Sequence, residues 1–390
     1  MKKRLFIGSA VLAFVVACSA LVILLRKEPG YQGKSIKSWA LQALAPQQEA
    51  RQEAIAAFQQ MGPKAVPQLA KLLERKDSLL RRTAWSLALN LPSGPRQRMV
   101  KKLQPLEAER VHIAAALSLE SFGPEAEKAV PALARVLVRD KALVRGYAAS
   151  ALGRIGGPAI PELFAAMSNK DTNVAYAAAS GLEQAGTNAL AAAPGLMMFF
   201  SSNDELRRNL ATGLLPKLGP GVLPFLKEAA ANPDPSMRMR VAGLFPLVHA
   251  PREQIVPPLL LMLKDKDAGC REKAVAALGF FQLPNRTILE GLLAATNDPK
   301  TSVRVAAIKT LGKPSLDTAH VVCVLSECLN DESPAIRTEA ARSLGSLGPA
   351  AQSALADLIR LGDANQDLVS LAARDAAAKI DRGKGANGQH

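Results

Sequence analysis

The chain has 390 residues, of which 48% are hydrophobic and only 4% are aromatic. An alanine-rich composition with few aromatic residues suits closely packed helices and argues against a β-sandwich, whose core draws on β-branched and aromatic side chains. Lys and Arg outnumber Asp and Glu by 49 to 34, so the formal net charge is +15. This positive charge could attract anionic partners, so its distribution along the chain matters.

Residues 1–30 form a basic and apolar N-terminal segment. An unbroken apolar run of 21 residues extends from Leu5 to Leu25, between Lys2, Lys3 and Arg4 on one side and Arg26 and Lys27 on the other. At about 1.5 Å per residue a helix of this length crosses a hydrocarbon core of about 30 Å. The sequence therefore predicts a transmembrane helix over residues 5–25.

Two alternatives to an uncleaved anchor remain open. A cleaved signal peptide would share the basic start, although its apolar core is usually about 7 to 15 residues. A lipoprotein would be acylated at Cys18, since "VVAC" at Val15–Cys18 resembles a loose lipobox, although the apolar run continues after the cysteine. The segment resembles a bacterial signal anchor, so we expect a single-pass inner-membrane protein with its body outside the cytoplasm; a cytoplasmic body is the alternative.

A repeat fills most of the remaining chain. Each beat opens with a small or aliphatic residue, usually followed by arginine, then small residues and a leucine, as in "LVRGYAASALGRIG" at residues 143–156. The beats recur every 30 to 33 residues, opening at Ala50, Leu80, Val111, Val144, Val174, Leu206, Met237, Cys270, Val303, Ile336 and Leu368. Such a regular period indicates an array of like units rather than separate domains.

Each unit is predicted to contain two helices. Val144, Ala148, Leu152 and Ile155 share one helical face, and a second amphipathic helix begins near Ile160 after Gly156, Gly157 and Pro158. Neighbouring units must stack to bury these faces. We expect the array to curve around a concave surface built mainly from the second helices, with kinks at prolines inside helices, namely Pro67, Pro131, Pro161, Pro224 and Pro257.

These beats, of the form "DxxxVRxxAAxALGxxG", resemble the HEAT-repeat family, in its short bacterial type that also occurs in phycobilisome-lyase-like proteins. The resemblance covers about residues 45–380, and "GYQGKSIKSWA" at Gly30–Ala40 is similar to the lead-in of membrane-anchored bacterial HEAT-repeat proteins. It implies an all-α fold, an α-solenoid of about eleven HEAT-like helical hairpins after one transmembrane helix. The expected parts are an anchor (1–30), a lead-in helix (31–44), the solenoid (45–382) and a disordered tail (383–390).

The arginine of the beat has two interpretations. It could track a phosphate backbone, or it could form a structural ladder with the aspartates that recur just upstream of each beat, in its own or a neighbouring unit. We favour the ladder because bidentate arginine–carboxylate geometry suits pairs that recur with one period. The predicted ladder arginines are Arg51, Arg81, Arg145, Arg207, Arg238, Arg271, Arg304 and Arg337. The predicted acids are Asp77, Asp140, Asp171, Asp204, Asp234, Asp267, Asp298 and Asp331.

The basic excess is local. Residues 31–110 hold 14 basic and 6 acidic residues, whereas residues 111–390 hold 30 and 27. A candidate contact patch lies beside the expected anchor, at Arg75, Lys76, Arg82, Arg96, Arg98, Lys101 and Lys102. Basic residues near a bilayer attract anionic headgroups at about 1 kcal/mol each. The patch favours anionic lipid or an acidic partner over nucleic acid, and ordinary solvated charge remains the alternative.

No residue cluster points to catalysis. The histidines are scattered and none is followed by Glu, so we expect no metal and no cofactor. Cys270, Cys323 and Cys328 form no CxxC pair and are expected to be buried thiols without a disulfide. Trp85 is expected in the core. The sequence predicts a non-enzymatic, membrane-anchored scaffold for protein partners; the alternatives are a binder of nucleic acid or anionic lipid, or a HEAT-fold enzyme whose site the sequence does not reveal.

Overall fold

The computed structural model describes residues 30–76, 79–97, 107–281, 286–313, 318–364 and 367–386. Internal contacts divide the chain into two compact units, Met1–Ala192 and Ala193–His390. The predicted transmembrane segment, residues 5–25, lies outside the described residues. Among the helices that are described, none is both long enough and apolar enough to span a bilayer.

The first unit opens with a small hairpin. Strand β1 (Gly30–Tyr31) pairs antiparallel with β2 (Lys34–Ser35), and the turn places Gln32 and Gly33 at positive φ of 49° and 75°. Helix α2 (Ile36–Gln42) follows, capped by the Ser35 side chain. Trp39 is 1% exposed and its indole N–H donates to the Tyr31 carbonyl at 2.9 Å. The lead-in predicted as a helix over residues 31–44 is therefore a hairpin followed by a shorter helix.

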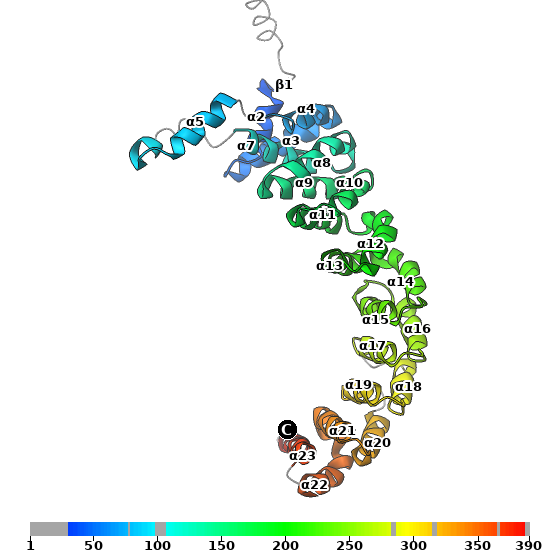
Figure 1. Cartoon of the computed structure of the whole chain (residues 1–390). Coiled ribbons are helices and arrows are strands. Elements are labelled where there is room, and N and C mark those ends of the chain that lie inside the picture. Colours follow the sequence, from blue (N-terminus) through cyan, green and yellow to red (C-terminus); the bar gives the residue numbers. More distant parts are fainter. Residues whose placement is uncertain are drawn as a thin grey trace, which may run out of the picture. The chain divides into compact units, whose positions relative to one another are not determined.

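The rest of the first unit alternates helices that open the beats with helices that follow them (Figure 1). The opening helices are α3 (Gln48–Met61), α5 (Leu79–Leu89), α7 (Glu107–Glu120), α9 (Ala142–Ile155) and α11 (Thr172–Ala185); the following helices include α4 (Val66–Leu72), α8 (Val130–Arg139) and α10 (Ile160–Met167). Helix α9 packs on α7, α8 and α11. This is the stacking that the repeat predicts.

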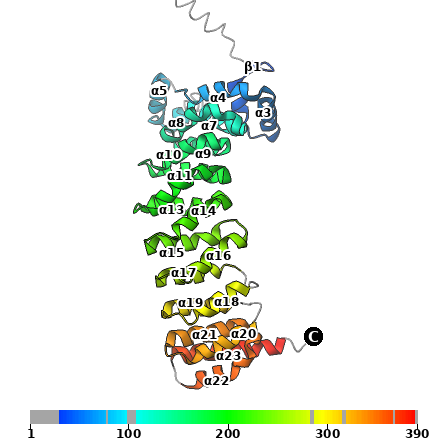
Figure 2. The ribbon, with the colours of Figure 1, turned by 90° about the vertical axis from the view of Figure 1, so that its right-hand side faces the viewer.

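The second unit has the same alternation in two layers. We call inner layer the helices α13 (Glu205–Leu214), α15 (Pro235–Leu244), α17 (Ala268–Leu278), α19 (Thr301–Leu311), α21 (Pro334–Leu347) and α23 (Leu368–Ala386). The outer layer consists of α12 (Ala193–Ser201), α14 (Leu223–Ala229), α16 (Arg252–Met262), α18 (Arg286–Ala295), α20 (Thr318–Glu327) and α22 (Leu355–Ala364). Figure 2 shows these pairs stacked as successive rungs.

The inner layer lines the concave side of the second unit, as Figure 1 shows. These are the helices that open the beats. The expectation that the second helix of each unit builds the concave surface is therefore wrong for this unit. The beat periodicity identifies which residues are buried, but it does not say which of two stacked layers lies on the inside of a curve.

Short 3₁₀ turns join the two helices of a unit. They are η1 (Gly62–Ala65), η2 (Gly123–Ala129), η3 (Gly157–Ala159), η4 (Gly186–Ala192), η5 (Leu215–Val222), η6 (Phe245–Leu247) and η8 (Gly348–Ala354), while η7 (Cys328–Asn330) follows α20. Gly156, which caps α9, has a φ of 76° that favours glycine.

The prolines occupy helix starts rather than helix interiors. Pro67, Pro131, Pro161 and Pro224 lie in the first turn of α4, α8, α10 and α14, so the predicted kinks are wrong for these four. The first turn of a helix has no intrahelical acceptor for the missing N–H, and proline is tolerated there. Pro257 is different, because it lies inside α16.

Close stacking depends on small residues. A Cβ added to Gly153 of α9 would lie 2.4 Å from the Gly181 carbonyl oxygen of α11. The backbones of the two helices therefore approach too closely for any side chain at that point, and the flanking Leu152 and Ile155 are fully buried. Alanine and glycine in the beats are thus a packing requirement.

The beat that opens at Leu80 does not stack like the others. On its N-terminal side in the stack, helix α7 packs on α2 and α4, two helices that precede α5 in the chain. In α5 itself Leu87 is 67% and Leu89 is 51% exposed, and Trp85, which the repeat assigns to the core, is half-buried. The stack therefore runs from α4 to α7 and bypasses α5.

The last helix extends further than expected. Helix α23 continues to Ala386, into the segment 383–390 predicted as a disordered tail, and residues 387–390 lie outside the described residues.

Candidate functional site

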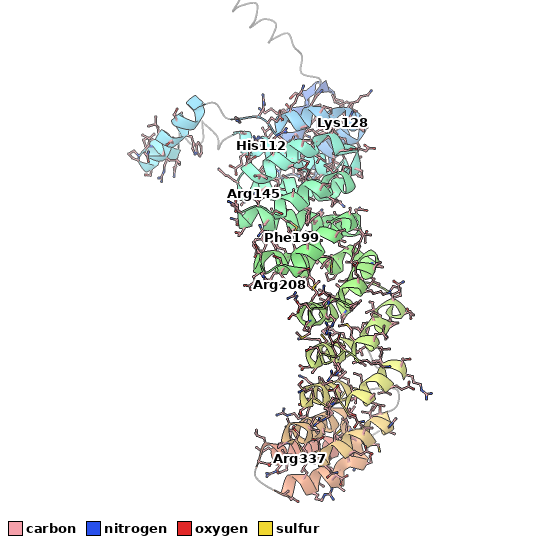
Figure 3. The ribbon with its side chains drawn as sticks, turned by 45° about the vertical axis from the view of Figure 1, so that its right-hand side comes forward. His112, Lys128, Arg145, Phe199, Arg208 and Arg337 are labelled. Atoms are coloured by element: carbon pink, nitrogen blue, oxygen red, sulfur yellow. The ribbon has the colours of Figure 1, made fainter. Side chains whose placement is uncertain are left out.

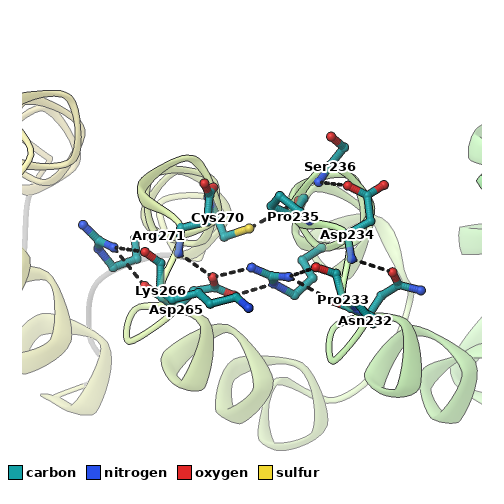
Figure 4. Close-up of polar contacts among 11 residues, drawn as sticks. Asn232, Pro233, Asp234, Pro235, Ser236, Asp265, Lys266, Cys270 and Arg271 are labelled. Carbon is teal, nitrogen blue, oxygen red and sulfur yellow. Dashed lines mark hydrogen bonds and ion pairs between the residues drawn. The ribbon is translucent and has the colours of Figure 1, made fainter.

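The arginine beat forms a ladder in the second unit. Arg238 donates from Nη1 to the carbonyls of Asn232 (2.8 Å) and Pro233 (3.0 Å), and from Nε and Nη2 to the Asp265 carboxylate, both at 2.7 Å (Figure 4). The side chains of Arg238 and Asp265 are only 6% and 11% exposed. One guanidinium therefore ties the loop before its own helix to the loop of the next repeat.

The same geometry recurs along the chain. Arg271 donates to the Asp265 carbonyl at 2.9 Å and to both Asp298 oxygens at 2.6 and 2.8 Å. Arg304 donates to the Asp298 carbonyl and lies 3.5 Å from Asp331. Each acid lies 27 positions after its arginine, which spans one repeat.

The Arg238–Asp265 and Arg271–Asp298 pairs are ionised at neutral pH. Hydrogen bonds from Arg238 and Arg271 hold the pKa of the Asp265 and Asp298 carboxyl groups below the usual value. The same bonds raise the pKa of both guanidinium groups. The charges are thus committed to the contact between repeats and not to an external ligand.

The other ladder arginines form parts of this arrangement. Arg51 donates to the Ala45 and Pro46 carbonyls, and Arg337 to those of Asp331 and Glu332. Arg145 donates to Leu137 and Asp140 carbonyls and lies 3.3 Å from Asp171. The side chain of Arg81 lies outside the described residues.

One ladder position is displaced by a residue. Arg208, not Arg207, donates to the carbonyl six positions upstream, that of Ser202, at 3.0 Å. Arg207 pairs with Asp204, the N-cap of its own helix. Arg208 and Arg337 are labelled among the side chains of the second unit in Figure 3. With two adjacent arginines in the sequence, only the helix phase decides which one faces the loop.

The acids differ from those expected at two beats. Asp234 and Asp267 cap their helices by accepting from the backbone N–H groups of Ser236 and Cys270. In the loop before α17 the ladder partner is Asp265, two positions before Asp267. The repeat spacing did not predict this residue. Both aspartates fit the period, so spacing alone could not separate cap from partner.

His112 takes the ladder position in the repeat after the bypassed helix. Its Nδ1 lies 2.7 Å from the Asp140 carboxylate, 28 positions ahead, and its Nε2 lies 2.9 Å from the Arg75 carbonyl, 37 positions behind. Elsewhere the carbonyl partner is five to eight positions behind, as with Arg238 and Arg145. His112 therefore joins the ladder across residues 77–106.

A hollow of about 310 Å³ lies at this junction. Its lining includes Arg75 and Lys76 on one side of the bypassed segment and Glu109, Arg139 and Lys141 on the other. Lys141 donates to Glu109 at 2.7 Å, which removes one of the cations from competition for a ligand.

The candidate basic patch is brought together only in part. Arg75 and Lys76 line the hollow, and Arg96 is exposed. Arg98, Lys101 and Lys102 lie outside the described residues, as does the side chain of Arg82.

No metal-binding group of His, Cys, Asp and Glu occurs among the described residues. The described cysteines are free: Cys270 is buried, Cys328 is half-buried, and Cys323 is exposed, which corrects the expectation that all three are buried. Burial raises the pKa of the Cys270 and Cys328 thiols to about 11. Neither is therefore an activated nucleophile.

Comparison with known proteins agrees with this architecture. A family model described as HEAT repeats matches residues 140–216 and 289–378. Among solved structures, importin β is 14% identical with a TM-score of 0.43, covering 89% of this chain and 55% of that one. Yeast importin-β, Kap95p, is 13% identical with a TM-score of 0.42, covering 90% and 56%.

The chain thus spans little more than half the length of either importin. The YibA protein of E. coli is 17% identical with a TM-score of 0.36, covering 78% of this chain and 98% of that one. No curated protein matches the sequence. Both units of the chain thus contain segments that match HEAT repeats.

Proposed function

We propose that the chain is a non-catalytic scaffold, held at a membrane by residues 5–25, that binds protein partners along the inner layer. The observation that carries the proposal is that the ladder charges pair with one another between repeats and leave the solvent-exposed face of the inner helices unoccupied. The ladder pairs are buried between repeats, as with Arg238 and Asp265, whereas the solvent face of each inner helix is free of that task. Repeats stacked in register then offer one continuous surface for shallow, multivalent contacts.

The scaffold proposal is tested by photo-crosslinking in the source cell. A photoreactive residue replaces Lys309 in the inner layer or, as the matched control, Lys227 in the outer layer, both exposed. We expect protein adducts of defined mass from position 309 in the full chain and fewer from position 227. Absence of protein adducts at both positions would count against the scaffold.

Membrane attachment is a separate part of the proposal. We expect the full chain in the membrane fraction after alkaline extraction, and its body accessible to protease added outside intact spheroplasts. Release of the chain by alkali would contradict anchoring by residues 5–25. Protection of the body from protease would place it on the cytoplasmic side.

Contact with anionic lipid is a second candidate, favoured by the bypass. The segment 77–106 that the ladder skips holds six basic residues and one acidic residue. Of these basic residues, the structure describes the side chain of Arg96, which is exposed and available to an anionic surface. Vesicles with and without phosphatidylserine, mixed with the full chain and with a deletion of residues 77–106, test it: we expect salt-sensitive binding that the deletion reduces.

A further inference from the structure

The inner-layer helices of the second unit, together with the turns that follow them, carry a row of solvent-facing side chains that the ladder does not use. Relative to each ladder arginine, the residues five and nine positions later point to solvent, while the intervening positions are mostly buried. After Arg271 these are Ala276 and Phe280, and after Arg304 they are Lys309 and Lys313. The regular repeat puts equivalent positions on neighbouring helices side by side.

The apolar part of the row is unusual for a surface. Phe280 is 72% exposed and Leu247, nine positions after Arg238, is 48% exposed. Beside them stand only small residues, Gly243 and Ala276, at the positions five after the arginine. Among the described residues, a Cβ at Gly243 would meet nothing within 4 Å, so the surface is open at that position on α15.

The next helices make the row basic. Lys309 and Lys313 are exposed on and just after α19, and Arg342 of α21 is 62% exposed. The Lys313 ammonium donates to the Gly279 carbonyl, which anchors a cation directly beside Phe280. Arg342 lies 3.7 Å from Glu339, too far for a hydrogen bond, so most of its donors face solvent.

Two carboxylates on the same face decide between anionic partners. Glu272, four positions before Ala276 on α17, and Glu339, 3.7 Å from Arg342, are both half-buried. A uniform phosphate backbone would meet both of them, whereas a polypeptide can place its carboxylates selectively.

We propose that the row formed by Leu247, Phe280, Lys309, Lys313 and Arg342 binds an extended peptide with two apolar side chains followed by two acidic ones. Packed helices lie about 8 to 10 Å apart. A peptide in the polyproline II conformation rises about 3.1 Å per residue with three residues per turn, so every third side chain faces the row. The peptide therefore advances one helix about every three residues. Its apolar side chains contact Leu247 and Phe280, and its carboxylates pair with the lysines of α19 and with Arg342.

This inference rests on the proposed scaffold function and names the chemistry of its partner. The probe is a display library of random peptides of about twelve residues, long enough to cross four helices, selected on the full chain in mild detergent. We expect enrichment of apolar and acidic residues in that order, at a spacing of about three residues, and binding that weakens in high salt.

Variants locate the selected peptides. Phe280→Ala and the double change Lys309→Glu with Lys313→Glu are each expected to weaken peptide binding by about tenfold or more. The matched controls are Leu261→Ala, since Leu261 is 73% exposed on outer helix α16, and Lys227→Glu on α14. Circular dichroism confirms that all variants keep the helical content of the parent.

The outcomes are distinct. Selected peptides that bind the Phe280 and lysine variants as well as the parent would overturn this site and leave the scaffold standing. Failure to enrich any apolar–acidic pattern would also overturn it. Failure of the scaffold itself would appear instead as the absence of protein crosslinks at position 309.

Discussion

The ladder is regular in the second unit, whereas in the first unit it skips one beat. In the second unit, the ladder arginines Arg238, Arg271 and Arg304 each reach back to the loop before their own helix and forward by 27 residues to the next acid. At His112 the backward contact spans 37 residues and skips a whole beat. The skipped beat, "LLRRTAWSLAL", nevertheless forms a helix, α5. A beat therefore predicts a helix, but its place in the stack depends on which neighbour offers the better contact.

The largest effect is expected where the continuous ladder is cut. Arg238→Ala leaves the Asp265 carboxylate, 11% exposed, without its partner, and unpaired buried charges cost about 3–5 kcal/mol. Urea unfolding should show this loss, and hydrogen exchange should place it in α15 and α17. The exposed Arg252→Ala is the control, expected within about 0.5 kcal/mol. Equal unfolding curves for the two variants would refute a structural ladder.

The ladder also predicts loss of stability in acid. The folded-state pKa of Asp265 and Asp298 is lowered, so their contribution is present above the unfolded carboxyl value of about 3.9 and disappears as the pH falls through the folded values. The parent should therefore lose stability below about pH 4. A double variant, Asp265→Asn with Asp298→Asn, should be less stable at neutral pH and change less over the same acid range. A parallel pH profile would contradict the assignment.

Close packing is tested next, within the stacked part of the first unit. Gly153→Ala must push α9 from α11, and overpacking of this kind costs about 1–3 kcal/mol. A Cβ added to Gly94, beyond α5 in the bypassed segment, would meet nothing within 4 Å, so Gly94→Ala should be close to neutral. Thermal melting of both variants compares the two regions directly.

A smaller effect is expected where the ladder skips a beat. His112→Ala removes the contacts to Arg75 and Asp140. It should cost about 1–3 kcal/mol, because the Arg75 carbonyl and the Asp140 carboxylate each lose a hydrogen-bond partner. The exposed His249→Ala is the control. If the two changes had the same effect on urea unfolding, His112 would not join the repeats.

The smallest effect is expected from deleting the bypassed segment. Replacement of residues 77–106 by a short flexible linker keeps α7 on α4 and keeps both His112 contacts. Stability should change by less than about 1 kcal/mol, given the weak dependence on loop length. Loss of cooperative unfolding in this variant would show that α5 belongs to the stack after all.

Much of the fold could be predicted from particular residues. Each of the eleven beat-opening residues, from Ala50 to Leu368, lies in a helix. Apolar residues at every third or fourth position share one side of a helix, so this spacing predicts helices. The candidate site was harder. Asp265 and Arg208 were missed because two acids or two arginines satisfied the same period, and only the backbone phase selected one. The Phe280 row was missed because exposure is a property of the stacked surface.

The periodic small and aliphatic side chains predicted the repeat, its helices and most of the buried residues, because stacked helical pairs satisfy such a pattern. Local chemistry also placed the turns, because a glycine at positive φ ends one helix and a proline begins the next. The folded chain alone reveals which beats stack, which acid each arginine reaches and which layer lies on the inside of the second unit. These choices depend on contacts between residues about one repeat apart, where many arrangements satisfy the same local pattern.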